Sequence, residues 1–77
     1  MFYTLESMRE GYNTWWELES VSGSLEIILE RAMDKGLFQF RVRNWEGGIV
    51  VQERQYEGER LVGHWRLGDN NEKIYKK

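Results

Sequence analysis

The segment Ser-Leu-Glu-Ile-Ile-Leu-Glu-Arg-Ala-Met-Asp-Lys-Gly, residues 24–36, has the pattern of one complete amphipathic helix. Its apolar residues recur at intervals of three and four, which places them along one side of a helix. Ser24 or Ser22 can cap the first turn, and Gly36 supplies the left-handed residue at which helices commonly end. We therefore expect a single short helix that packs through five apolar side chains: Leu25, Ile28, Leu29, Ala32 and Met33.

The sequence after this helix alternates with a period of two, which is typical of half-buried strands. Phe38, Phe40 and Val42 alternate with polar residues, so we expect these three side chains to face the helix. Two glycine-containing interruptions then separate further strands over 49–56 and 60–67. Because turns this short join antiparallel neighbours, the three strands are predicted to form a meander.

The sequence before the helix predicts a strand over 13–21 and a further strand over 2–7. Together the elements indicate an α+β fold of order (β)βαβββ, an antiparallel sheet of about four to five strands with the helix packed on one face. Leu29 and Trp65 are expected to be buried where the helix crosses the central strands. Residues 72–77 are interpreted as either a short edge strand or a frayed basic tail.

The composition sets the broad class of the protein. A chain of 77 residues buries only one core, so residues 1–77 are expected to form a single domain. The chain has no cysteine, which excludes a disulfide framework and a thiolate metal site. No apolar run reaches the roughly 18 residues of a membrane span, and a cytoplasmic location is the expectation. The four Trp, four Tyr and three Phe exceed what one short helix can cover, which predicts a homodimer.

The residues that could carry catalysis are few. His64 is the only histidine, and a nucleophilic triad needs a base beside its nucleophile. Glu17 and Glu19, like Glu57 and Glu59, form carboxylate pairs; we interpret the first pair as cross-strand partners of arginines and the second as solvated turn residues. A metal site would need further His or Cys ligands, which the sequence lacks. We therefore predict no enzyme activity, no cofactor and no metal.

One face of the sheet is expected to present arginines between aromatic residues. Such a composition is typical of hot spots in protein interfaces and of surfaces that bind single-stranded nucleic acid. A third interpretation is a solvent-exposed face on which the arginines pair with Glu17, Glu19 and Glu53. If the alternation stays in register, this face lies opposite the helix and carries eight candidate partner-binding residues: Trp15, Arg41, Arg43, Trp45, Arg54, Tyr56, His64 and Arg66.

The helix itself offers a second candidate surface. Glu26, Glu30 and Asp34 follow one another at intervals of four, which predicts an acidic stripe away from the apolar side. The net charge of −2 also differs from the basic surplus of most nucleic-acid-binding domains. We therefore predict a small non-enzymatic protein–protein interaction module with a regulatory or inhibitory role, acting through the arginine and aromatic face or through the acidic stripe. A single-stranded nucleic-acid-binding domain is the alternative.

Overall fold

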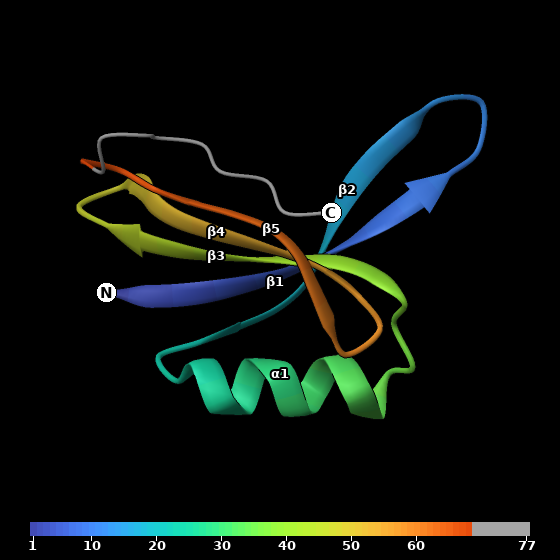
Figure 1. Cartoon of the computed structure of the whole chain (residues 1–77), viewed down its shortest axis with the longest axis horizontal. Coiled ribbons are helices and arrows are strands. Elements are labelled where there is room, and N and C mark those ends of the chain that lie inside the picture. Colours follow the sequence, from blue (N-terminus) through green and yellow to red (C-terminus); the bar gives the residue numbers. More distant parts are fainter. Residues whose placement is uncertain (69–77) are drawn as a thin grey trace.

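The structure of this chain, a computed structural model, describes residues 1–68 and consists of one helix and five strands (Figure 1). The predicted edge strand or tail at 72–77 lies outside the described residues. The elements in chain order are β1 (Phe2–Glu10), β2 (Thr14–Ser22), α1 (Leu25–Asp34), β3 (Gln39–Glu46), β4 (Ile49–Glu57) and β5 (Arg60–Arg66).

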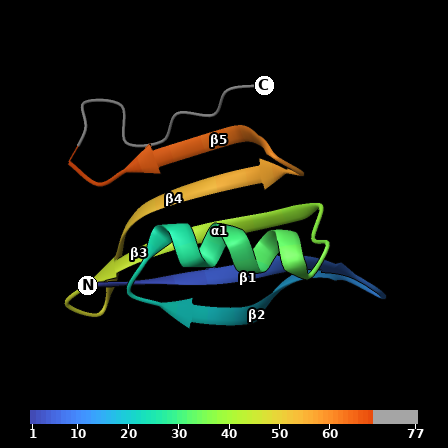
Figure 2. The same ribbon diagram turned by 90° about the horizontal axis from the view of Figure 1, so that it is seen from below.

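The five strands form one antiparallel sheet with the order β2-β1-β3-β4-β5. The helix α1 connects β2 at one edge to β3 on the other side of β1, and in doing so it crosses one face of the sheet (Figure 1). It lies over β1 and its two neighbours, while β4 and β5 extend beyond it (Figure 2). The predicted α+β class and element order are confirmed.

Both ends of α1 are fixed by residues that the sequence pattern singles out. The Ser24 hydroxyl accepts a hydrogen bond from the Ile27 backbone N–H at 3.3 Å, so Ser24 is the N-cap. Gly36 has a φ of +66°, and its N–H donates to the Met33 carbonyl while the Leu37 N–H donates to the Ala32 carbonyl. This pair of bonds is the Schellman arrangement, which needs a residue in the left-handed conformation.

The two hairpin turns of the meander also depend on glycine. Gly47 and Gly48 have φ values of +59° and +82°, the combination that a two-residue type I′ turn requires. Gly58 has a φ of +63° in the turn between β4 and β5. Both turns are short enough to hold adjacent strands in antiparallel register.

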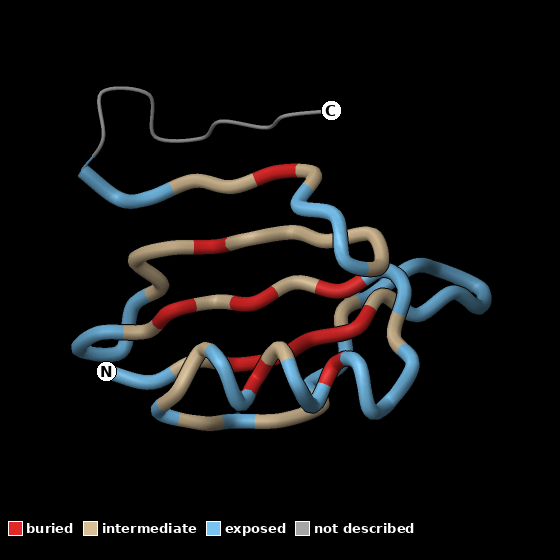
Figure 3. The backbone as a smooth tube through the Cα atoms, turned by 60° about the horizontal axis from the view of Figure 1, so that its bottom comes forward, coloured by how far each residue is buried: buried red, intermediate tan, exposed pale blue. Residues whose placement is uncertain are grey.

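The core lies between α1 and the middle of the sheet (Figure 3). The half-buried Leu29 packs against this core, as do Leu25, Leu37, Tyr3 and Tyr56. Met33 and Phe38, which were expected to pack inward, are both exposed: Met33 lies at the margin of the helix surface, and Phe38 precedes the first residue of β3. The buried apolar residues are Leu5, Ile28, Ala32, Phe40 and Val42.

Trp65 does not contribute to this core. It pairs with Glu53, which pairs with Arg43, and this row lies on the face away from α1. Its side chain is only half-buried there. The prediction that Trp65 is buried beneath the helix is wrong, because the face that it occupies on β5 is the one that α1 does not cover.

Candidate functional site

The eight candidate residues divide between the two faces of the sheet. Residues directly opposite each other on neighbouring strands share a face. Val42 is buried against α1 and pairs with Arg54, so Arg54 lies on the helix side. Arg41 pairs with Gln55 and lies on the opposite face, which we call the far side. The prediction of one continuous face is therefore wrong.

A β-bulge causes this division. The turn at 47–48 pairs Glu46 with Ile49, a register that would place Arg41 opposite Arg54 if it continued. The register shifts between Asn44 and Trp45, and beyond the shift every residue of β4 faces the other way relative to β3. Arg41, Arg43 and Trp45 consequently stay on the far side, and the helix side receives Arg54, Tyr56, His64 and Arg66.

Trp15 also lies on the opposite face to the one expected. Trp15 pairs with Arg9, which shares the helix side with Leu5 and Ser7 of the same strand. Trp16 lies on the far side, and the guanidinium carbon of Arg41 stands 4.3 Å from the centre of its ring. This cation–π contact makes Trp16, which sequence reasoning missed, a member of the far-side group.

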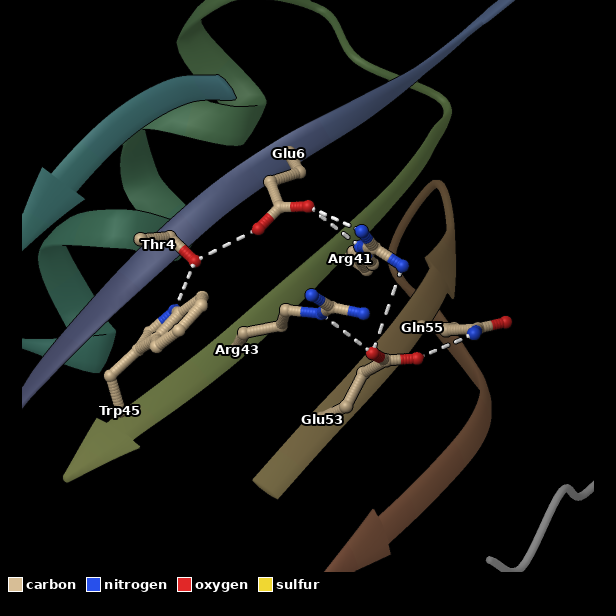
Figure 4. A network of polar contacts seen from close by, with 7 residues as sticks. All are labelled: Thr4, Glu6, Arg41, Arg43, Trp45, Glu53 and Gln55. Carbon is tan, nitrogen blue, oxygen red and sulfur yellow. Dashed lines mark hydrogen bonds and ion pairs between the residues drawn. The ribbon is translucent and has the colours of Figure 1, made fainter. Parts of the chain in front are cut away.

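Arg41 and Arg43 are held by two glutamates on the far side (Figure 4). Arg41 donates to Glu6 from Nε at 2.8 Å and from Nη2 at 2.6 Å, and its Nη1 lies 3.8 Å from Glu53. Arg43 donates from Nε to Glu53 at 2.8 Å. Gln55 completes the shell around Glu53 by donating from Nε2 at 2.7 Å. Two positive and two negative charges thus cancel within one connected network.

The network is largely removed from solvent. The side chain of Glu53 is 4% exposed, and those of Glu6 and Arg41 are 11% and 13% exposed. Thr4 donates to Glu6 at 3.1 Å and accepts from the indole N–H of Trp45 at 2.9 Å, so the polar atoms around the carboxylate are paired as well. Charges buried to this degree are tolerated because each is paired and hydrogen-bonded. The third interpretation is therefore right in pairing arginines with Glu53, but it is wrong in placing them on a solvent-exposed face.

The predicted role of Glu17 and Glu19 as partners of an arginine is also confirmed, on the helix side. Arg9 lies 3.1 Å from Glu17 and 2.6 Å from Glu19. The hydroxyl of Ser7 donates to Glu19 at 2.6 Å, and this hydrogen bond, with Arg9, lowers the pKa of the Glu19 carboxyl. These two glutamates are therefore engaged within the fold.

Two separate cavities lie along the helix-side row of β4, beside α1, and we call the pair the groove. At one end Tyr56 stacks on Phe40, with ring centres 5.0 Å apart and planes inclined by 12°. Burial raises the pKa of Tyr56, although Arg54 acts in the opposite direction. A cavity of about 160 Å³ at this end is lined by Leu29, Met33, Phe40, Tyr56, Gly58 and Glu59. We call this part the apolar end of the groove.

The other end of the groove is polar and basic. A cavity of about 530 Å³ lies there, and Arg54 and Arg66 contribute to its lining. Neither arginine forms an ion pair with a carboxylate among residues 1–68. Asn44 is 9% exposed, and its Oδ1 has no hydrogen-bond partner in the described part of the chain. The remaining lining residues are Met1, Tyr3, Glu46, Val51, Gln52 and Leu67.

His64 stands beside Arg54 on the helix side, and its Nδ1 is buried without a hydrogen-bond partner among the described residues. The acidic stripe of Glu26, Glu30 and Asp34 is exposed on α1. Since Ile28 and Ala32 hold the other side of the helix against the sheet, the stripe points away from the sheet.

The described residues were also compared with the requirements of a metal site and of a membrane-spanning helix. Within residues 1–68, no three His, Asp or Glu side chains are grouped so that they could hold a metal ion. None of the helices in that range is long and apolar enough to cross a membrane. The chain matches no family model, no curated protein and no solved structure.

Proposed function

We propose that this chain is a non-enzymatic protein-interaction module whose helix-side groove binds an acidic segment of a partner protein. The observation that carries the proposal is the contrast between the two ends of the groove. Arg54 and Arg66 have no carboxylate partner among the described residues, and Arg54 is the next helix-side residue of β4 after Tyr56, which stacks on Phe40. A segment with carboxylates and apolar side chains matches both ends. Arginine and tyrosine are also the residue types that dominate interface energetics.

The nucleic-acid alternative is less well supported. Arg41 and Arg43, which were to hold phosphates, are neutralised by Glu6 and Glu53. Arg54 and Arg66 lie on the same side of the sheet as the acidic stripe of α1, whose field opposes the approach of a polyanion. A peptide segment with apolar side chains between its carboxylates gains in addition from contacts with the apolar end of the groove.

We also propose that the chain self-associates through the far side. Phe2, Leu18 and Val21 expose apolar side chains on that face. The charges of its network already cancel, so two copies can meet there across a two-fold axis without net repulsion. Sedimentation at high micromolar concentration should give a dimer that Leu18→Glu converts to a monomer; a monomeric wild-type chain would contradict this part of the proposal. The proposed function also includes a cytoplasmic location and a regulatory or inhibitory role.

The groove is tested with peptides whose C-termini are amidated, so that only side-chain carboxylates are presented. A 12-residue peptide alternating Glu with Leu or Phe is titrated into the full chain, alongside a version with Lys for Glu and a single-stranded oligo-dT. Arg54→Gln/Arg66→Gln should weaken binding of the acidic peptide at least about 10-fold. The matched control is Arg60→Gln, which removes a highly exposed arginine at the start of β5 and should leave affinity unchanged. The proposal would be overturned if the double variant bound the acidic peptide as tightly as the wild-type chain does. It would also be overturned if the wild-type chain bound oligo-dT more tightly than the acidic peptide.

A further inference from the structure

The polar end of the groove combines three features that suit one chemical group. It has two arginines, a buried amide oxygen without a hydrogen-bond partner among the described residues, and a cavity of about 530 Å³ to receive a ligand. We propose that it captures the C-terminal carboxylate of a partner polypeptide. The inference rests on the proposed function, because it identifies which part of the partner enters this end.

The positions of Arg54 and Arg66 allow both to reach one carboxylate. Arg54 pairs with His64 and Gln52 pairs with Arg66, so the two arginines are diagonal neighbours on adjacent strands. Diagonal neighbours on one face lie about 7–8 Å apart at the backbone, within the reach of two long side chains that converge on a shared ligand. A guanidinium presents paired N–H donors that match the two oxygens of a carboxylate.

Asn44 distinguishes a chain terminus from a side-chain carboxylate. Asn44 lines the cavity, and its Oδ1 is a buried acceptor with no donor within residues 1–68. A buried acceptor without a donor is costly, so turning this side chain toward a ligand N–H in the cavity gains that energy back. The last residue of a polypeptide carries a backbone N–H two bonds away from its carboxylate carbon. An Asp or Glu side chain has no donor so close to its carboxylate.

The apolar end fixes the direction of the bound segment. The helix-side row of β4 runs from Tyr56 through Arg54 to Gln52, so a segment whose terminus lies at the arginines extends back toward the stack on Phe40. An apolar side chain a few residues before the terminus would then lie in the cavity beside Leu29 and Met33. The class of ligand is therefore a C-terminal peptide with apolar side chains. Glu46 also lines the polar cavity, and its carboxylate opposes the ligand's charge.

The test compares three versions of one probe, acetyl-Glu-Leu-Phe-Leu: the free acid, the C-terminal amide, and the free acid with its last backbone nitrogen methylated. Binding is followed by NMR on the intact chain through the Asn44 side-chain amide and the arginine Nε–H signals. We expect the amide to bind at least about 10-fold more weakly than the acid, and the methylated acid about 3- to 10-fold more weakly.

Variants assign these losses to residues. Arg66→Gln should reduce the ratio between acid and amide affinities to near 1, and Arg60→Gln should leave the ratio intact. Glu46→Gln, which removes the opposing charge, should increase the affinity for the free-acid probe about twofold. Asn44 is buried and its variants can unfold, so the methylated probe takes their place. Equal binding of acid and amide would overturn the inference, while arginine-dependent binding of the amidated 12-residue peptide would leave the proposed function standing.

Discussion

The two faces of the sheet use arginine in opposite ways. On the far side Arg41 and Arg43 pair with Glu6 and Glu53 and are largely buried, so their charges are neutralised within the fold. On the helix side Arg54 and Arg66 line a cavity and have no carboxylate partner in the described chain. The same residue type, placed on neighbouring strands, is structural on one face and open to a ligand on the other. The difference shows that the partners of an arginine, more than its presence on a strand, indicate its role.

The largest expected effect is on the far side. Glu53→Gln removes the carboxylate that Arg43 and Gln55 share, and leaves a partly buried guanidinium without its partner. Breaking a buried pair in this way costs about 3–5 kcal/mol, a large part of the stability of a small domain. Urea unfolding measures the change. Glu57→Gln is the control, because its pair with the exposed Arg60 should be worth under about 1 kcal/mol. Similar midpoints for the two variants would refute a structural role for the network.

The next prediction separates the core from the groove within α1. Ile28 is fully buried, so Ile28→Ala should destabilise the chain by about 2–5 kcal/mol. Leu29 is half-buried at the wall of the groove, so Leu29→Ala should lower the free energy of unfolding by less, about 1–2 kcal/mol. The same substitution should weaken binding of the acidic peptide. Urea unfolding and the peptide titration provide both readouts. A larger stability loss for Leu29→Ala than for Ile28→Ala would show that the helix is rotated relative to this structure.

A smaller effect is expected from pH, through Glu19. Its pKa is lowered from 4.5 in the folded state by the Ser7 hydrogen bond and by Arg9. A lowered carboxyl pKa stabilises the fold above the unfolded value and loses that contribution as the pH falls through the folded value. The free energy of unfolding should therefore decline as the pH falls below about 5, and the decline should be shallower in Glu19→Gln. Parallel pH profiles for the two proteins would contradict this assignment.

The smallest effect on stability is predicted for the groove arginines. Arg54→Gln/Arg66→Gln removes no ion pair to a described residue, so its urea midpoint should match that of the wild-type chain within about 0.5 kcal/mol. Unchanged stability combined with lost peptide binding is the signature of a binding surface. A destabilisation as large as that of Glu53→Gln would instead assign these arginines a structural role.

Much of the fold could be predicted from local signals. The period of the apolar residues, the cap at Ser24 and the stop at Gly36 define α1, and the glycines at 47–48 and 58 define the meander. The assignment of faces could not be predicted, because a bulge inside a strand leaves no mark comparable to a turn glycine. One extra residue near Val51 moved Arg54 and Tyr56 to the other face. Asn44 and Trp16 were missed for the same reason, since their importance depends on which neighbours share their face.

The most direct test of the contrast between the two faces is NMR of the four arginine Nε–H groups in the intact chain, before and after addition of the amidated acidic peptide. The Nε–H groups of Arg41 and Arg43 donate hydrogen bonds at 2.8 Å in the free protein, so they should exchange slowly with water and keep their shifts when the peptide binds. Those of Arg54 and Arg66 should exchange rapidly at first, then shift and slow on binding. Peptide-induced changes at Arg41 and Arg43, with Arg54 and Arg66 unaffected, would contradict the account.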